Sequence, residues 1–121
     1  MTNTVEYFID GKRVSPQAGV RCSDINPATG KILAEVAMDE VSAADAAVSA
    51  AVDAFPAWRD TPVGERCQIL FLYKQLLEEH FDELAQMIVT EHGKNMPEAR
   101  GDVRRGIDCV EYACGAPSLM M

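Results

Sequence analysis

The spacing of apolar residues changes near residue 41, and this change constrains the fold more than any other feature of the chain. Before it, short runs show the alternation typical of strands; after it, apolar residues recur every three or four positions, which is the period of a helix. We therefore predict an α/β fold with short strands, including a hairpin, in residues 1–40, followed by four α-helices.

Two turn signals divide the strand half. Asp10 and Gly11 suit the positive φ angles of a two-residue hairpin turn. The run Asn26-Pro27-Ala28-Thr29-Gly30 marks a second turn, because Pro and Gly both favour turn geometry. Residues 22–25 before this turn and 31–38 after it are predicted strands.

The helices are predicted near residues 42–56, 62–79, 81–92 and 97–114. Ser42 is expected to cap the first helix and Pro56 to end it. Thr61 is expected to cap the second, with Pro62 in the first helical position, where its missing N–H costs nothing. Gly93 is placed to end the third helix.

The second predicted helix carries two apolar rows rather than one. The first row is Val63, Cys67, Leu70 and Leu77, and the second is Ile69, Leu72 and Leu76. Because one packing partner cannot cover both rows, we expect this helix to expose apolar surface when the chain is isolated.

The fourth predicted helix has a single stripe, formed by Ala99, Val103, Ile107, Val110 and Cys114. Gly101 and Gly106 each cost a helix about 1 kcal/mol relative to Ala, which predicts that another backbone approaches closely there. Arg104 and Arg105 both lie at ion-pair spacing from Asp108. A solvated charged face is the favoured interpretation of these arginines.

Size and charge exclude several classes of function. With 121 residues the chain has the length of one ordinary domain, too short for an enzyme with separate cofactor and substrate lobes. Its formal charge of −8 disfavours nucleic acid and anionic membrane surfaces as partners. No run approaches a membrane-spanning length and no signal peptide is apparent, so we expect a cytoplasmic protein with no membrane partner.

The four cysteines are expected to remain thiols in a reducing compartment. Cys109 and Cys114 are five residues apart on one helix, so their side chains point about 140° apart and cannot form a disulfide. Cys67 and Cys114 fall on apolar faces and are expected in the core, whereas Cys22 is the thiol expected to be most exposed.

Other chemical motifs are incomplete. His80 and His92 form no metal-binding pattern, and no two glycines have the spacing of a dinucleotide fingerprint. Gly93-Lys94 lacks the first glycine of a phosphate loop, since position 88 is Ile, and fits a helix end better. We therefore assign no catalytic, cofactor-binding or metal-binding residue in this chain.

Several ordered motifs nevertheless resemble a known family. They are Phe8-Ile9-Asp10-Gly11-Lys12, Asn26-Pro27-Ala28-Thr29-Gly30-Lys31, Ala54-Phe55-Pro56-Ala57-Trp58-Arg59, Glu91-His92-Gly93-Lys94 and Val110-Glu111-Tyr112-Ala113-Cys114-Gly115. Together they resemble the start of an aldehyde dehydrogenase, in particular the CoA-acylating methylmalonate-semialdehyde dehydrogenase branch. The resemblance covers nearly the whole chain.

The resemblance implies that residues 1–121 are an incomplete amino-terminal part of an aldehyde dehydrogenase, within its cofactor-binding domain. Enzymes of that branch use NAD and CoA to oxidise malonate or methylmalonate semialdehyde to an acyl-CoA. Their catalytic cysteine, general base and cofactor contacts lie in later sequence, so the chain alone is expected to bind neither cofactor and to be inactive. Its expected partner is the remainder of the dehydrogenase.

Two other functions stay open. The chain could be an interaction or regulatory module whose helices pair with a second copy or with a full-length dehydrogenase. A weaker alternative is an independent thiol enzyme, which a single hyper-reactive cysteine would reveal.

Overall fold

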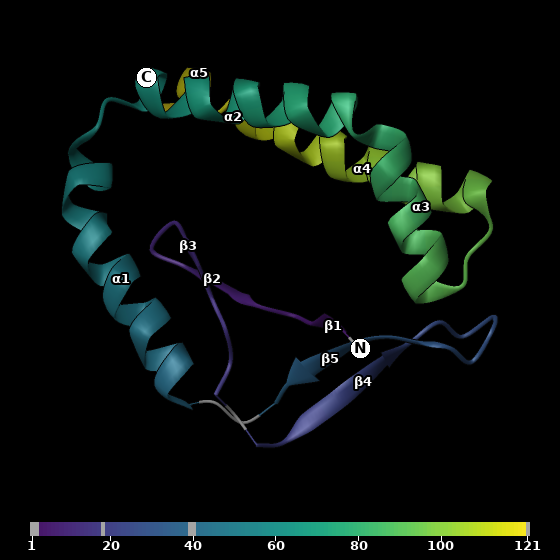
Figure 1. Ribbon diagram of the computed structural model, residues 1–121. Coiled ribbons are helices and arrows are strands. Elements are labelled where there is room, and N and C mark those ends of the chain that lie inside the picture. The colour runs from purple at the N-terminus through teal and green to yellow at the C-terminus, as the bar shows by residue number, and fades with distance from the viewer. Residues whose placement is uncertain (1–2, 18, 39–40, 121) are drawn as a thin grey trace. The chain divides into compact units, whose positions relative to one another are not determined.

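The computed structural model describes residues 3–17, 19–38 and 41–120. Within them the strands all precede residue 38 and the helices all follow residue 40, which confirms the predicted α/β order (Figure 1). The chain divides into two units, Met1–Arg59 and Asp60–Met121, which are described separately.

A β-hairpin occupies the predicted position in the first unit. β2 (Tyr7–Ile9) pairs antiparallel with β3 (Lys12–Val14). Asp10 and Gly11 both have positive φ angles, 52° and 71°, as the turn requires.

A second sheet has the order β1-β5-β4. β4 (Arg21–Ile25) and β5 (Ile32–Ala37) are antiparallel, as the turn between them predicts, whereas β1 (Asn3–Thr4) joins β5 in parallel. Asn26 stabilises the turn, since its Oδ1 accepts hydrogen bonds from the backbone N–H groups of Ala28 and Thr29 at 2.9 and 3.1 Å. The parallel pairing of β1 was not predicted.

The first helix is longer than its predicted range. α1 (Val41–Asp60) contains Pro56 inside it, so the prediction that Pro56 ends the helix is wrong. An interior proline removes one hydrogen bond and its ring crowds the carbonyl of residue i−4, which disfavours a helix but does not have to end it. Ser42 lies within the helix rather than at its cap, and none of the residues of α1 is buried.

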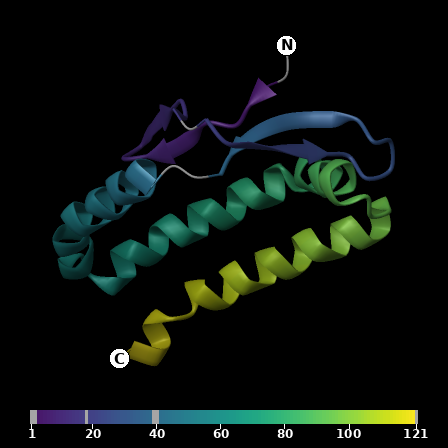
Figure 2. The ribbon, with the colours of Figure 1, turned by 90° about the horizontal axis from the view of Figure 1, so that it is seen from below.

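Three helices form most of the second unit. They are α2 (Val63–Glu79), α3 (Phe81–His92) and α4 (Met96–Cys114), and a short α5 (Pro117–Met120) follows. α4 runs beside α2 in Figure 2, and it also packs against α3. The predicted ranges of α2, α3 and α4 are therefore confirmed within one residue, although α5 was not predicted.

The core of this unit centres on the stripe of α4. Ala99, Val103 and Ile107 are buried with Ala85 of α3, and Ile107 is only 1% exposed. In α2 the first apolar row is half-buried apart from the buried Cys67, and its Leu77 packs against the core. The second row, Ile69, Leu72 and Leu76, is exposed. The sequence-based expectation of an apolar exposed helix is thus met by the structure.

Helix ends show which local signals decide the boundaries. Gly93 has the left-handed φ of 79° that ends α3, as predicted. Asn95 caps α4 by accepting a hydrogen bond from the N–H of Glu98 at 3.0 Å, a role that the sequence analysis missed although the Asn-x-x-Glu spacing is a capping signature. Pro62 occupies the capping position of α2, so the prediction that Thr61 caps that helix is wrong.

The two glycines inside α4 do not mark a close backbone approach. A Cβ atom added at Gly101 or Gly106 would meet no heavy atom within 4 Å. The predicted close packing is therefore wrong for this chain, because both positions face open space.

Candidate functional site

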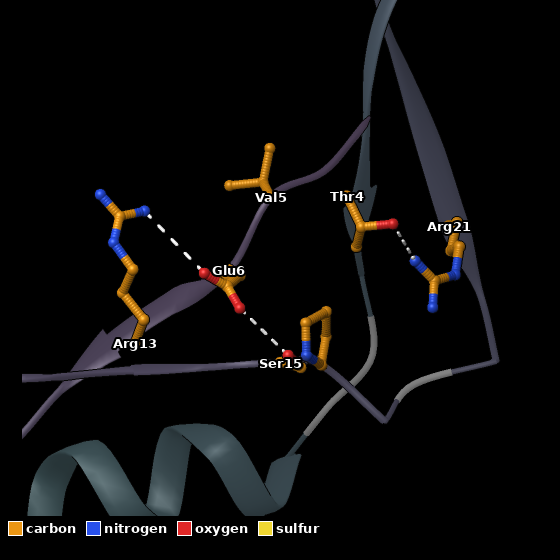
Figure 3. Close-up of a pocket in the computed structure, with 7 residues that line it drawn as sticks. Thr4, Val5, Glu6, Arg13, Ser15 and Arg21 are labelled. Carbon is orange, nitrogen blue, oxygen red and sulfur yellow. Dashed lines mark hydrogen bonds and ion pairs between the residues drawn. The ribbon is translucent and has the colours of Figure 1, made fainter. Parts of the chain in front are cut away.

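A polar pocket of about 590 Å³ lies in the first unit. Figure 3 shows the residues that line it, which are Thr4, Val5, Glu6, Arg13, Ser15, Pro16 and Arg21. They come from three stretches of chain: the end of β1 and the residues after it, β3 and the residues after it, and the start of β4. Sequence reasoning missed this pocket, since no spacing pattern joins these stretches.

Two arginines and one carboxylate dominate the charge of this pocket. Arg21 donates a hydrogen bond from Nη1 to the hydroxyl of Thr4 at 3.1 Å. Glu6 accepts a hydrogen bond from the hydroxyl of Ser15 at 3.1 Å and lies 3.9 Å from Nη1 of Arg13 (Figure 3). The pocket therefore carries one more positive charge than negative charge.

The second unit holds its charged side chains in pairs between helices. Arg104 of α4 donates to both carboxylate oxygens of Glu78 in α2, at 2.6 and 3.0 Å. The hydrogen bond from Arg104 holds the pKa of Glu78 below its ordinary value, although desolvation partly opposes this, and the same bond raises the pKa of Arg104. Arg104 and Arg105 both lie at ion-pair spacing from Asp108 in the sequence, but Arg104 bonds Glu78 and Arg105 bonds Asp102.

Two further pairs continue this pattern along the helices. Arg100 of α4 donates to Asp82 of α3 at 3.0 Å, and Lys74 of α2 lies 2.8 Å from Glu111 of α4. The hydrogen bond with Glu111 raises the pKa of Lys74. These pairs explain the acidic and basic residues of α4 as contacts that hold helices together.

Asp102 has two cationic neighbours. Lys94 and Arg105 both donate hydrogen bonds to its carboxylate. The bond from Lys94, followed by that from Arg105, lowers the pKa of Asp102. The carboxylate of Asp102 therefore joins α4 to Lys94, which lies just before that helix, and to Arg105 within it.

The structure divides the cysteines into two classes. Cys67 and Cys114 are buried, as predicted, while Cys22 and Cys109 are exposed. All four are free thiols, and the sulfur of Cys67 lies 4.0 Å from the backbone oxygen of Ala113.

The two histidines are also separate. His80 Nδ1 lies 2.7 Å from Glu83 at the start of α3, and His92 is the last residue of that helix. Over residues 3–17, 19–38 and 41–120, no group of three His, Cys, Asp or Glu side chains could hold a metal ion. None of the helices in the same ranges is long and apolar enough to cross a membrane.

Comparison with known proteins identifies the class. The family model described as "Aldehyde dehydrogenase family" matches residues 14–121. The chain belongs to the aldehyde dehydrogenase family.

Individual relatives narrow the similarity to one branch. A malonate-semialdehyde dehydrogenase of Geobacillus kaustophilus is 49% identical over 120 residues, which are 99% of this chain and 25% of that protein. A malonate-semialdehyde dehydrogenase of Halalkalibacterium halodurans is 50% identical over 117 residues, 97% of this chain and 24% of that protein. The chain thus spans about a quarter of the length of the relatives that it matches.

Solved structures agree with this similarity. The crystal structure of methylmalonate-semialdehyde dehydrogenase from Oceanimonas doudoroffii matches all of this chain and 24% of its own, with 41% identity and a TM-score of 0.92. A Sinorhizobium meliloti protein assigned to the same enzymes, crystallised with NAD, matches with 37% identity and a TM-score of 0.93 over 25% of its chain. The fold of this chain is that of the corresponding part of an aldehyde dehydrogenase.

Proposed function

We propose that residues 1–121 form the amino-terminal part of a CoA-acylating, NAD-dependent dehydrogenase of malonate or methylmalonate semialdehyde. One observation carries the proposal: identity near 49% extends over almost the whole chain while covering only a quarter of the relatives. The chain then supplies a structural segment of the cofactor-binding domain, and the rest of the enzyme supplies the chemistry.

The exposed apolar surface of α2 supports this proposal. Ile69, Phe71, Leu72 and Leu76 are 44–56% exposed on that helix. Several large apolar side chains exposed along one helix are often covered by another part of the protein or by a partner. The remaining three quarters of a dehydrogenase would provide such a cover.

The settings of the cysteines support the proposal that the chain alone is inactive. Acyl transfer requires a thiolate beside a base, with hydrogen-bond donors directed at the carbonyl oxygen. Cys67 and Cys114 are buried where a substrate has no access, and Cys22 and Cys109 are exposed at the surface. Neither class provides an enclosed, activated thiolate.

Cofactor binding is likewise assigned to the rest of the enzyme. The dinucleotide fingerprint of doubly wound folds is a glycine-rich turn between a strand and a helix, and the glycines of this chain lack the required spacing. We propose that NAD and CoA bind only when the later sequence is present.

A chimera tests the proposal directly. Residues 1–121 replace the corresponding segment of the Geobacillus kaustophilus relative, and NADH formation is followed with NAD, CoA and malonate semialdehyde. We expect activity in the chimera and none in the isolated chain. The matched control carries Ile107→Asp, which places a charge in the core and should abolish activity, whereas Ile69→Val on the exposed face should not.

Two results would contradict the proposal. An inactive chimera that is folded and has the quaternary state of the relative would show that this segment is not equivalent. Turnover by the isolated chain that disappears when one cysteine is changed to Ser would show that the segment is itself an enzyme.

The same exposed face of α2 favours a second candidate, an interaction module that pairs with itself or with a full-length dehydrogenase. Sedimentation of the isolated chain over a range of concentrations tests self-pairing. A concentration-dependent dimer that Leu72→Glu disrupts would support the module, and a monomer at every concentration would reject self-pairing.

A further inference from the structure

We propose that the polar pocket of the first unit binds a small oxyanion, a carboxylate or a phosphate, through Arg13 and Arg21. The pocket lies between the β-hairpin and the ends of β1 and β4 (Figure 3). This proposal does not depend on the role proposed above, in which the chain is a structural segment of a dehydrogenase.

The guanidinium groups of Arg13 and Arg21 each have N–H donors that are not used in the contacts of the pocket. Arg21 uses Nη1 to bond the hydroxyl of Thr4, and among the described residues no acceptor contacts its Nε or Nη2. The contact between Arg13 and Glu6 is 3.9 Å long, which is an ion-pair distance rather than a hydrogen bond. Because a guanidinium presents its donors as a planar fork, it matches the paired oxygens of a carboxylate or phosphate.

Charge within the pocket also favours an anion. Glu6 is balanced by Arg13 and by the hydroxyl of Ser15, so its charge is already compensated. No carboxylate of the described residues lies within ion-pair distance of Arg21. The positive charge of Arg21 therefore remains available in a protein whose formal charge is −8.

Strand contacts hold the framework of the pocket. The N–H of Val5 donates to the backbone oxygen of Glu35 at 2.9 Å, which ties the chain after β1 to β5. Arg21 of β4 is the pairing partner of Ala37 in β5, on the edge of β5 opposite β1. The stretches that carry Thr4 and Arg21 are thus fixed to β5, whereas Arg13 lies on the separate β2–β3 hairpin. The contacts of Arg13 and Ser15 with Glu6 join that hairpin to the pocket, and the buried Pro16 adds an apolar surface.

The dimensions fit a small molecule rather than a polymer. A volume of about 590 Å³ falls within the range of ordinary small-molecule sites. The hydroxyls of Thr4 and Ser15 can bond polar groups next to the anionic one. The chemical class is therefore a small organic acid or a phosphate-bearing metabolite.

The test uses the full chain and two probes in separate arms, inorganic phosphate and malonate, with chloride keeping the ionic strength constant. NMR follows the backbone amides of Ser15 and Arg21 and the Nε–H groups of Arg13 and Arg21. We expect saturable shifts confined to the pocket. Arg21→Gln should weaken binding about tenfold or more, since it removes charge-assisted hydrogen bonds.

Lys31→Gln is the matched control, because it removes one positive charge from the first unit outside the pocket. It should leave the affinity for either probe nearly unchanged, and Arg13→Gln, as a second pocket variant, should weaken it. Binding of one probe only would identify the source as carboxylate or phosphate. The proposal is overturned if neither probe gives saturable shifts, or if Lys31→Gln weakens binding as much as the arginine variants.

Discussion

Glu78 and Arg104 join α2 to α4 through two hydrogen bonds, of 2.6 and 3.0 Å, although 26 residues separate them in the sequence. The guanidinium also lies 4.9 Å from the ring centroid of Phe81, at the start of α3. A guanidinium group bonded to both oxygens of a carboxylate fixes the orientation of both side chains. This pair therefore orients α2 against α4 at the surface of their shared core.

Acidification should weaken the pairing of these helices. The pKa of Glu78 is lowered in the folded chain, so its stabilising effect is complete above the ordinary value of 4.5 and is lost as the pH falls through the lower folded pKa. We expect Glu78→Gln to lower the melting temperature slightly at pH 7 and to make it less sensitive to pH below about 5. Added salt should reduce the difference, since both side chains are partly exposed.

Glu79→Gln is the control for this experiment. Glu79 is the next residue of α2, and its carboxylate accepts a hydrogen bond from the neutral side chain of Gln75 at 2.7 Å. An equal change in pH dependence for Glu79→Gln and Glu78→Gln would contradict the assigned role of Arg104.

Truncating an isoleucine to alanine should destabilise the chain much more at a buried position than at an exposed one. Ile107 is 1% exposed and Ile69 is 56% exposed, so Ile→Ala creates a cavity only at the first. We expect Ile107→Ala to lower the free energy of unfolding by about 2–5 kcal/mol. Ile69→Ala should change it by about 0.5 kcal/mol or less in the isolated chain, as measured by urea denaturation.

The chimera described above extends this comparison. If the remainder of a dehydrogenase covers α2, Ile69→Ala should destabilise the chimera more than it destabilises the isolated chain. An equal, small effect in both proteins would count against coverage at that position.

One substitution, Gly→Ala, should have opposite effects at two positions. Gly93 has a φ of 79°, where a Cβ atom costs about 1–2 kcal/mol, so Gly93→Ala should destabilise the second unit. Gly101 lies inside α4 with nothing within 4 Å of an added Cβ, so Gly101→Ala should stabilise the isolated chain by about 1 kcal/mol. Thermal melting followed by circular dichroism measures both, and a loss of stability for Gly101→Ala would contradict the open position.

Thiol labelling should proceed in two phases. Cys22 and Cys109 are exposed and should react at once with Ellman's reagent, whereas Cys67 and Cys114 are buried and should react only as the second unit opens. The double variant Cys22→Ser/Cys109→Ser should lose the fast phase and keep the slow one. A fast phase that persists in this variant would place Cys67 or Cys114 at the surface.

The local structure of the chain was largely predictable from its sequence. The Asp10-Gly11 turn, the Asn26–Gly30 turn and the end of α3 at Gly93 depend on backbone angles that few other residues adopt readily. The stripe of α4 was also predictable, because a helix that buries one face must repeat apolar residues at its own period. Each of these signals lies within a few neighbouring residues.

Tertiary structure alone decided which distant groups meet. Asp108 lies four residues from Arg104 on the same helix, whereas Glu78 lies 26 residues earlier in the sequence. Only the packing of α2 beside α4 brings Glu78 into contact with Arg104. The pocket around Arg13 and Arg21 likewise depends on strand pairings that no local pattern specifies. Periodicity determines which face of an element is apolar, but the choice of partner depends on the free energy of packing the whole chain.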